Sequence, residues 1–142
     1  MTAKEYLNQI RGYEISINAL EREIQRLEDD LIRISGIDYS RPRVDSSAQT
    51  DAVSAAAMDE IDAVKQRRID LINREQRARN RIIDQIRGMK HELFKVILLD
   101  RYVYMLSFDA IAKNHHYSLD YIIHAHGWAL QEFEQLYKDD IK

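Results

Sequence analysis

At 142 residues, the chain has the length of one ordinary domain, or of a long helical hairpin that carries a smaller globular unit. The absence of cysteine excludes disulfides, thiolate zinc sites and a cysteine nucleophile. The net charge of −3 is unevenly distributed, because residues 65–95 hold 10 basic and 4 acidic residues between two acidic segments.

Four glycines and one proline leave few enforced helix ends, and the apolar residues recur at helical spacing, so we expect an all-α protein. The N-terminal segment MTAKEYLNQIRGYE is charged throughout, and no stretch approaches the ~20 apolar residues that span a membrane. We therefore expect no membrane partner and a cytoplasmic location. No Ser/His/Asp or paired-carboxylate arrangement is visible, so we expect neither an enzyme nor a cofactor.

The first predicted helix carries a heptad seam that starts at Tyr6. Its apolar positions alternate four and three residues apart, at Ile10, Tyr13, Ile17, Leu20, Ile24, Leu27, Leu31 and Ile34. A stripe this narrow requires a partner helix. Ile at a and Leu at d would suit a parallel homodimer, but the flanking positions are acidic, at Glu14, Glu21, Glu23, Glu28 and Asp30.

The segment Asp51–Gly88 offers an antiparallel partner within the same chain. Its a/d-like positions are Ala57, Ile61, Val64, Arg68, Leu71, Glu75, Ala78 and Ile82, of which Arg68 and Glu75 interrupt the apolar seam. Its flanks are basic, with Lys65, Arg67, Arg74, Arg79 and Arg81. The apolar pairs expected are Leu31 with Ile61, Leu27 with Val64, Leu20 with Leu71, and Ile10 with Ile82. The same register pairs Glu28 with Lys65, Glu14 with Arg79, and Glu23 with Arg67.

This hairpin explains the apolar seam and the charge asymmetry together, so the basic run needs no nucleic acid to account for it. Arg77, Arg87 and Lys90 lie off the paired flanks and stay candidates for phosphate contacts. We place the hairpin at residues 1–88, with a loop at 36–51 that contains Pro42 and a Ser/Asp/Thr cluster. Residues 89–142 form the second predicted domain.

Two serines mark helix starts in the second domain. Ser107 precedes a short helix that runs to about Asn114, and Ser118 precedes one that runs from Leu119 to about Tyr137. Apolar residues from both helices and the preceding one are expected to form a common core: Leu99, Val103, Leu106, Ile111, Ile122, Ala125, Ala129 and Phe133. This order predicts a helix-turn-helix, whose second helix enters the DNA major groove.

The residues that carry a family resemblance follow one another over about Leu99 to Leu136. They are Arg101-Tyr102, Leu106-Ser107-Phe108, Ile111-Ala112, Tyr117-Ser118, Ile122, His126-Gly127 and Ala129-Leu130. They resemble phage and prophage transcriptional regulators whose C-terminal domain is like region 4 of bacterial sigma factors, as in late-gene regulators of the ArpU and RinA type. The resemblance implies binding of double-stranded DNA in the cytoplasm of a phage-infected bacterium, as a homo-oligomer or together with host RNA polymerase.

The expected DNA-binding residues lie around the second helix: Lys113, Ser118, Leu119, Asp120, Tyr121, His124 and Trp128. The chain departs from the family where His115-His116 replaces the usual Leu-Gly of the turn. It also has no Lys or Arg between Lys113 and Lys138, which leaves few phosphate contacts. The alternative is therefore an interaction or inhibitor protein on the same scaffold, which binds a host or phage protein.

Histidines 115, 116, 124 and 126 invite a zinc hypothesis. His124 and His126 project about 200° apart on a helix, so we expect solvent-facing or capping histidines and no metal. Tyr121 and Trp128 have two interpretations as well. They are either exposed for stacking on a base or a protein groove, or partly buried against the neighbouring helix.

Overall fold

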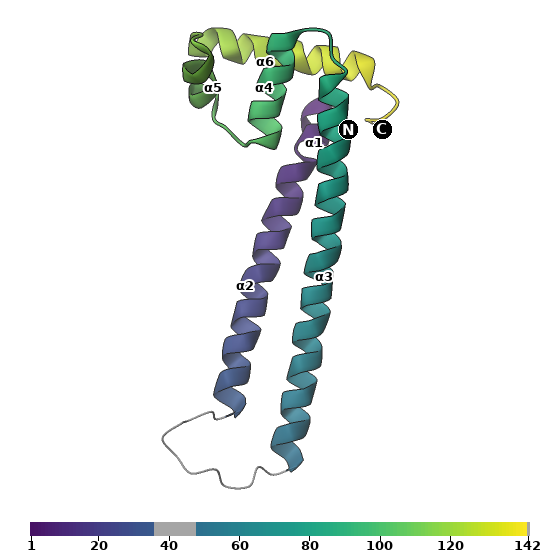
Figure 1. Cartoon of the computed structure of the whole chain (residues 1–142), viewed down its shortest axis with the longest axis vertical. Coiled ribbons are helices and arrows are strands. Elements are labelled where there is room, and N and C mark those ends of the chain that lie inside the picture. The colour runs from purple at the N-terminus through teal and green to yellow at the C-terminus, as the bar shows by residue number, and fades with distance from the viewer. Residues whose placement is uncertain (36–47, 142) are drawn as a thin grey trace. The chain divides into compact units, whose positions relative to one another are not determined.

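The computed structural model describes the backbone of residues 1–35 and 48–141 and the side chains of residues 1–33 and 54–141. These residues form six α-helices and one π-helix, and no strand occurs among them, which confirms the all-α class. The helices are α1 (Ala3–Leu7), α2 (Gln9–Ser35), α3 (Ala48–Arg87), α4 (Glu92–Leu98), the π-helix η1 (Leu99–Val103), α5 (Phe108–His115) and α6 (Leu119–Leu136) (Figure 1).

The chain divides into two compact units. The paired-helix unit is Ile15–Asn73, and the head unit combines Met1–Glu14 with Arg74–Lys142. This division does not coincide with the boundary expected between residues 88 and 89. The reason is that Ile10 of α2 and Ile82 of α3 are buried in one cluster with Phe133 of α6, so the ends of both long helices belong to the head unit.

Within the paired-helix unit, α2 and α3 run side by side in opposite directions (Figure 1). Leu20, Ile24 and Val64 form a buried cluster, against which Leu27 and Leu71 pack. The heptad positions predicted this cluster, since residues spaced alternately three and four apart share one helix face. Each fully buried aliphatic side chain contributes about 1.5–3 kcal/mol to the stability of the packed pair.

The ion pairs across this unit follow the prediction in one case and differ in the other. Lys65 Nζ lies 3.1 Å from a carboxylate oxygen of Glu28, as predicted. The pair predicted between Glu23 and Arg67 is wrong, since no ion pair joins these two residues among the described side chains. Arg68 Nη2 instead lies 3.1 Å from Glu21. Arg68 stands at a seam position, and its long side chain extends past the seam to reach the acidic flank.

Arg79 explains the second interruption of the seam, in the head unit. Its guanidinium lies 2.8 Å from Glu14, as predicted, and 2.6 Å from Glu75 one turn earlier. Glu75 is only 8% exposed, so its carboxylate needs this partner. Glu75 can therefore occupy an a-type seam position, because its buried charge is paired with Arg79.

The N-terminus differs from the continuous helix expected from Tyr6 onward. α1 begins earlier, because Thr2 and Glu5 form a capping box in which each side chain accepts a hydrogen bond from the other residue's backbone N–H. The helix is interrupted at Asn8, and α2 begins at Gln9. α1 thereby buries Ala3, Tyr6 and Leu7 in the cluster that contains Phe133 of α6.

The loop expected at 36–51 is shorter at its C-terminal end than predicted. α3 begins at Ala48, so residues 48–51 are helical. Ala48 and Gln49 are favourable helix residues, and they extend the helix that follows. Residues 36–47 lie outside the described part of the chain, as does the side chain of the predicted seam residue Ile34.

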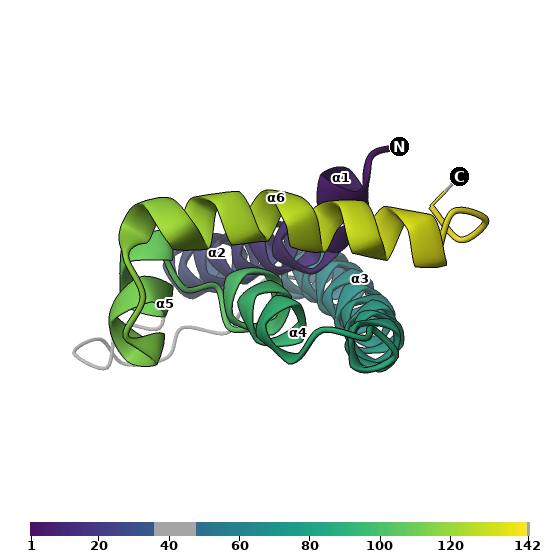
Figure 2. The same cartoon turned by 90° about the horizontal axis from the view of Figure 1, so that it is seen from above.

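In the head unit, α6 packs across α4 and α5, and α1 lies against it as well (Figure 2). The common core predicted for this region is two clusters. Ile111, Ile122 and Ala125 pack with Ile97 and Ala112, whereas Val103, Ala129 and Phe133 belong to the cluster of Ile10 and Ile82. The cause is length, because Ile122 and Phe133 lie about 16 Å apart along one helix and contact different neighbours.

Candidate nucleic-acid interface

Serine caps define the start of α5 and of α6, as predicted. The hydroxyl of Ser107 accepts from the N–H of Ala110, and that of Ser118 accepts from the N–H of Tyr121, each at 3.2 Å. Each cap satisfies a backbone donor that has no partner within its helix.

Three residues, His116–Ser118, join the two helices. His116 adopts the left-handed conformation, with φ 61° and ψ 38°, at the position where the resembled family usually has glycine. The chain therefore makes the turn without glycine, at a cost of about 1–2 kcal/mol for the side chain's clash with its own backbone. His115 also has a partner within the protein, because its Nε2 lies 2.8 Å from a carboxylate oxygen of Asp100.

The buried face of the α5–α6 pair fixes which residues point outward. Ile111 on α5 and Ile122 on α6 are fully buried on Ile97 of α4. Residues on the opposite face of α6 are consequently exposed to solvent. All seven predicted site residues lie on exposed positions: Lys113, Ser118, Leu119, Asp120, Tyr121, His124 and Trp128.

Four of the exposed rings form a row along the start of α6, called here the aromatic row: Tyr117, Tyr121, His124 and Trp128. The rings of Tyr117 and Tyr121 stack with their centroids 5.1 Å apart. The ring of Trp128 lies edge-on to Tyr121, with centroids 6.2 Å apart, and its centroid is 6.4 Å from that of His124. Tyr121 and Trp128 are 40% and 47% exposed, which decides between the two interpretations of these residues. Sequence reasoning missed Tyr117 because it lies in the turn.

The electrostatic character of this face is acidic or neutral. α6 contains no Lys or Arg, and its first turn carries Asp120, while Lys113 is contributed by α5. The Nδ1 of His124 lies 2.7 Å from the carbonyl oxygen of Asp120, so this ring bonds to the backbone of its own helix. The face therefore offers aromatic surface and hydrogen-bonding groups more than positive charge.

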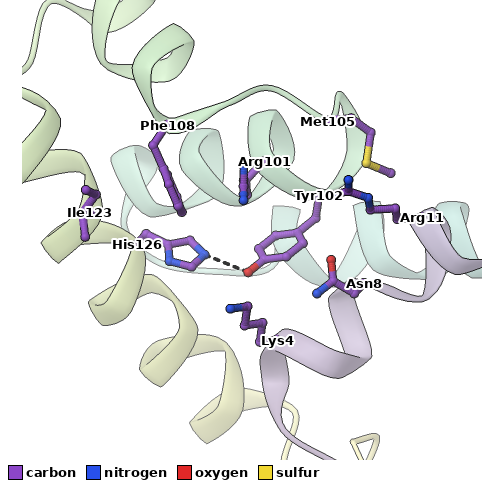
Figure 3. Close-up of a pocket in the computed structure, with 9 residues that line it drawn as sticks. All are labelled: Lys4, Asn8, Arg11, Arg101, Tyr102, Met105, Phe108, Ile123 and His126. Carbon is purple, nitrogen blue, oxygen red and sulfur yellow. Dashed lines mark hydrogen bonds between the residues drawn. The ribbon is translucent and has the colours of Figure 1, made fainter.

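His126 corrects the expectation of solvent-facing or capping histidines. It is 9% exposed, and its Nε2 lies 2.8 Å from the Tyr102 hydroxyl in a hydrogen bond between α6 and η1 (Figure 3). Burial, then the positive charges of Arg101 and Lys4, lower the pKa of His126 to about 4. Burial likewise raises the pKa of Tyr102 to about 12. The spacing of Ile122, His126, Ala129 and Phe133 is the signal that places this histidine on the apolar stripe.

Arg101 of η1 lies beside the buried pair of Tyr102 and His126. It donates to the carbonyl oxygen of Leu106 at 3.1 Å, and its guanidinium carbon lies 4.2 Å from the centre of the Phe108 ring. Phe108 in turn makes an edge contact with His126, with centroids 4.9 Å apart. Two residues of the resembled motif, Arg101 and Phe108, therefore have a structural role beneath the exposed face.

Neither a metal site nor a membrane span occurs in the described part of the chain. No group of three His, Asp or Glu side chains there is arranged to hold a metal ion. None of its helices is long and apolar enough to cross a membrane. Comparison with known proteins returned no matching family model, no matching curated protein and no matching solved structure.

Proposed function

We propose that the chain is a DNA-binding transcriptional regulator that inserts the start of α6 into the major groove. The observation that carries this proposal is the α5–α6 unit: two serine-capped helices, joined by a three-residue turn and held on α4 by Ile97, with the opposite face of α6 exposed. This order of helices supports a helix-turn-helix, in which a single helix fits the width of the major groove.

The proposal also includes the architecture around that unit. The contacts of Leu20, Ile24 and Val64 and the pair Glu28–Lys65 support an antiparallel coiled-coil hairpin formed by α2 and α3. By resemblance to phage late-gene regulators, the protein would act in the cytoplasm of a bacterial host, as a homo-oligomer or with host RNA polymerase.

Individual residues receive roles from their position on the exposed face. Lys113 would contact a phosphate, and the N-terminus of α6 at Ser118 would face the phosphate backbone with its positive dipole end. In this proposal Asp120, in the first turn of α6, would accept from the amino group of a cytosine, and the exposed Tyr121 and Trp128 would make apolar contact with bases.

Replacing Asp120 with Arg tests this assignment. The substitution removes an acidic group from the first turn of α6 and adds a phosphate contact, so we expect tighter non-specific binding and a loss of sequence preference. Asp109→Arg is the matched control, because Asp109 holds the same position after Ser107 that Asp120 holds after Ser118. Anisotropy titrations of specific and scrambled duplexes should show reduced discrimination for Asp120→Arg only. If the native protein and both variants discriminate equally between the specific and the scrambled duplex, α6 does not contact the DNA.

A second candidate function is supported by the composition of the same face. Tyr117, Tyr121 and Trp128 are each 40–47% exposed, and α6 carries no basic residue to attract DNA. Exposed aromatic surface without positive charge is typical of a protein-binding site. In that case the protein would bind a host or phage protein through the aromatic row, and native protein would show no salt-dependent binding to duplex DNA.

A further inference from the structure

A pocket of about 280 Å³ opens in the head unit, between α1, the start of α2, the η1 segment, α5 and α6 (Figure 3). Its wall has an apolar part and a polar part. Met105, Phe108 and Ile123 form the apolar part, and Asn8, Tyr102 and His126 contribute hydrogen-bonding groups. The volume is close to the lower end of the range for small-molecule pockets.

The charged residues that line this pocket are all basic. They are Lys4 of α1, Arg11 of α2 and Arg101 of η1, and no carboxylate lines the pocket. Among the described residues, none of these three side chains takes part in an ion pair. Arg101 uses one donor on the Leu106 carbonyl, which leaves further N–H groups of its guanidinium for another partner.

The convergence of these charges needs a physical explanation. Three cations around one partly enclosed space repel one another, and the enclosure strengthens that repulsion. The neighbouring His126 responds to these charges, since burial lowers its pKa most and Arg101 and Lys4 lower that pKa further. No carboxylate of the pocket offsets the charge, although the chain as a whole is acidic.

We propose that this pocket binds a phosphate group, held by Lys4, Arg11 and Arg101. Guanidinium groups bind phosphate through paired N–H donors, and a lysine adds a third cationic donor. The apolar wall at Met105 and Ile123 would contact the organic part that carries the phosphate. That part is either a small molecule or the backbone of DNA, and the proposal requires the proposed function only for the second source.

Titration of the full-length protein with inorganic phosphate, followed by amide NMR, tests the proposal without DNA. We expect saturable shifts at Lys4, Arg11 and Arg101 that sodium chloride at matched ionic strength does not produce. The double variant Lys4→Gln/Arg11→Gln should bind phosphate at least tenfold more weakly, because charge-assisted hydrogen bonds are lost. Arg22→Gln/Lys138→Gln, a matched change of one arginine and one lysine at exposed positions outside the pocket, should bind as the native protein does.

A second titration with a short duplex distinguishes the sources of the phosphate. If duplex and phosphate shift the same amides and compete for the pocket, the DNA backbone is the ligand. Shifts with phosphate alone identify a small phosphorylated molecule. Phosphate shifts that equal those of chloride, or that persist in the pocket variant, would overturn the proposal whatever the duplex result. Because the native titration needs no variant, it decides the matter even if the variant does not fold.

Discussion

Two histidines of the head unit occupy unusual environments, and the effect expected of each on stability depends on its immediate surroundings. His116 occupies a left-handed backbone position that favours glycine, and His126 occupies a buried site that favours a neutral ring. The histidines alone indicate neither environment, since four of them lie within twelve residues without a common role, and only the apolar spacing around His126 places that residue on the buried stripe.

His116→Gly should stabilise the protein by about 1 kcal/mol, because glycine adopts φ 61° without the clash of a Cβ atom. The control is His115→Gly, one residue earlier. There the backbone is helical and the ring is bonded to Asp100, so the same substitution should destabilise. Chemical denaturation of the three proteins measures both effects. A loss of stability in His116→Gly would mean that the ring of His116 contributes more than its backbone costs.

His126 should make stability fall as the pH falls from about 6.5 to about 4. The folded pKa is lowered to about 4, so in this range the unfolded chain binds a proton that the folded chain does not. The loss is about 2–3 kcal/mol over the range, and it ends below the folded pKa. Because carboxylates titrate in the same range, the measurement is the difference in unfolding free energy between native protein and His126→Gln. Parallel pH profiles of the two proteins would contradict the assignment.

At the scale of helices, local signals were predictable, whereas interactions between distant segments were predictable in part, as the pairs Glu28–Lys65 and Glu14–Arg79 show. Ser107 and Ser118 cap their helices as the sequence predicts, because a cap depends on three or four neighbouring residues. The heptad spacing predicted that Leu20, Ile24 and Val64 are buried, because it too depends on neighbouring residues within one helix. The pairing of Arg68 with Glu21 depends on how far a long side chain extends across two helices, which spacing alone does not determine.

Leu20→Asp should destabilise the α2–α3 pair by several kcal/mol, because it places a charge in the buried cluster with Ile24 and Val64. Ile15→Asp is the matched control on the same helix. Ile15 is 61% exposed, so its replacement should change stability by no more than about 0.5 kcal/mol. Thermal unfolding followed by circular dichroism compares them. Equal melting temperatures for the two variants would mean that Leu20 is not on the seam.

Arg79→Gln should cost about 1–3 kcal/mol, chiefly because Glu75 would keep a buried charge without its partner. The pair with the more exposed Glu14 adds less. Arg81→Gln, at an exposed position of the same helix, is the control and should be close to neutral. Adding Glu75→Leu to Arg79→Gln should restore most of the loss, since the seam becomes apolar there. No recovery in the double variant would show that Arg79 stabilises through other contacts.

For the whole molecule, the all-helical class and the exposed face of α6 were predictable, because both follow from periodicity along single segments. The phosphate pocket was not. Lys4 and Arg11 are separated from Arg101 by about ninety residues, and they meet only because α1 folds onto α6 in the head unit. The short α1 depends on the capping box of Thr2 and Glu5, a signal outside the heptad pattern. A charge count along the sequence therefore assigns the basic character to residues 65–95 and misses this site.

The salt dependence of duplex binding by the native protein tests the central claim most directly. A DNA-binding surface releases counterions, so the affinity for a labelled duplex from its own promoter region should fall with salt, by a slope of about −0.9 per phosphate contacted. Two or more contacts predict a loss of at least about tenfold between 50 and 200 mM salt. A native protein that binds no duplex, or whose binding is independent of salt, would contradict the regulator proposal and favour a protein partner for the aromatic row.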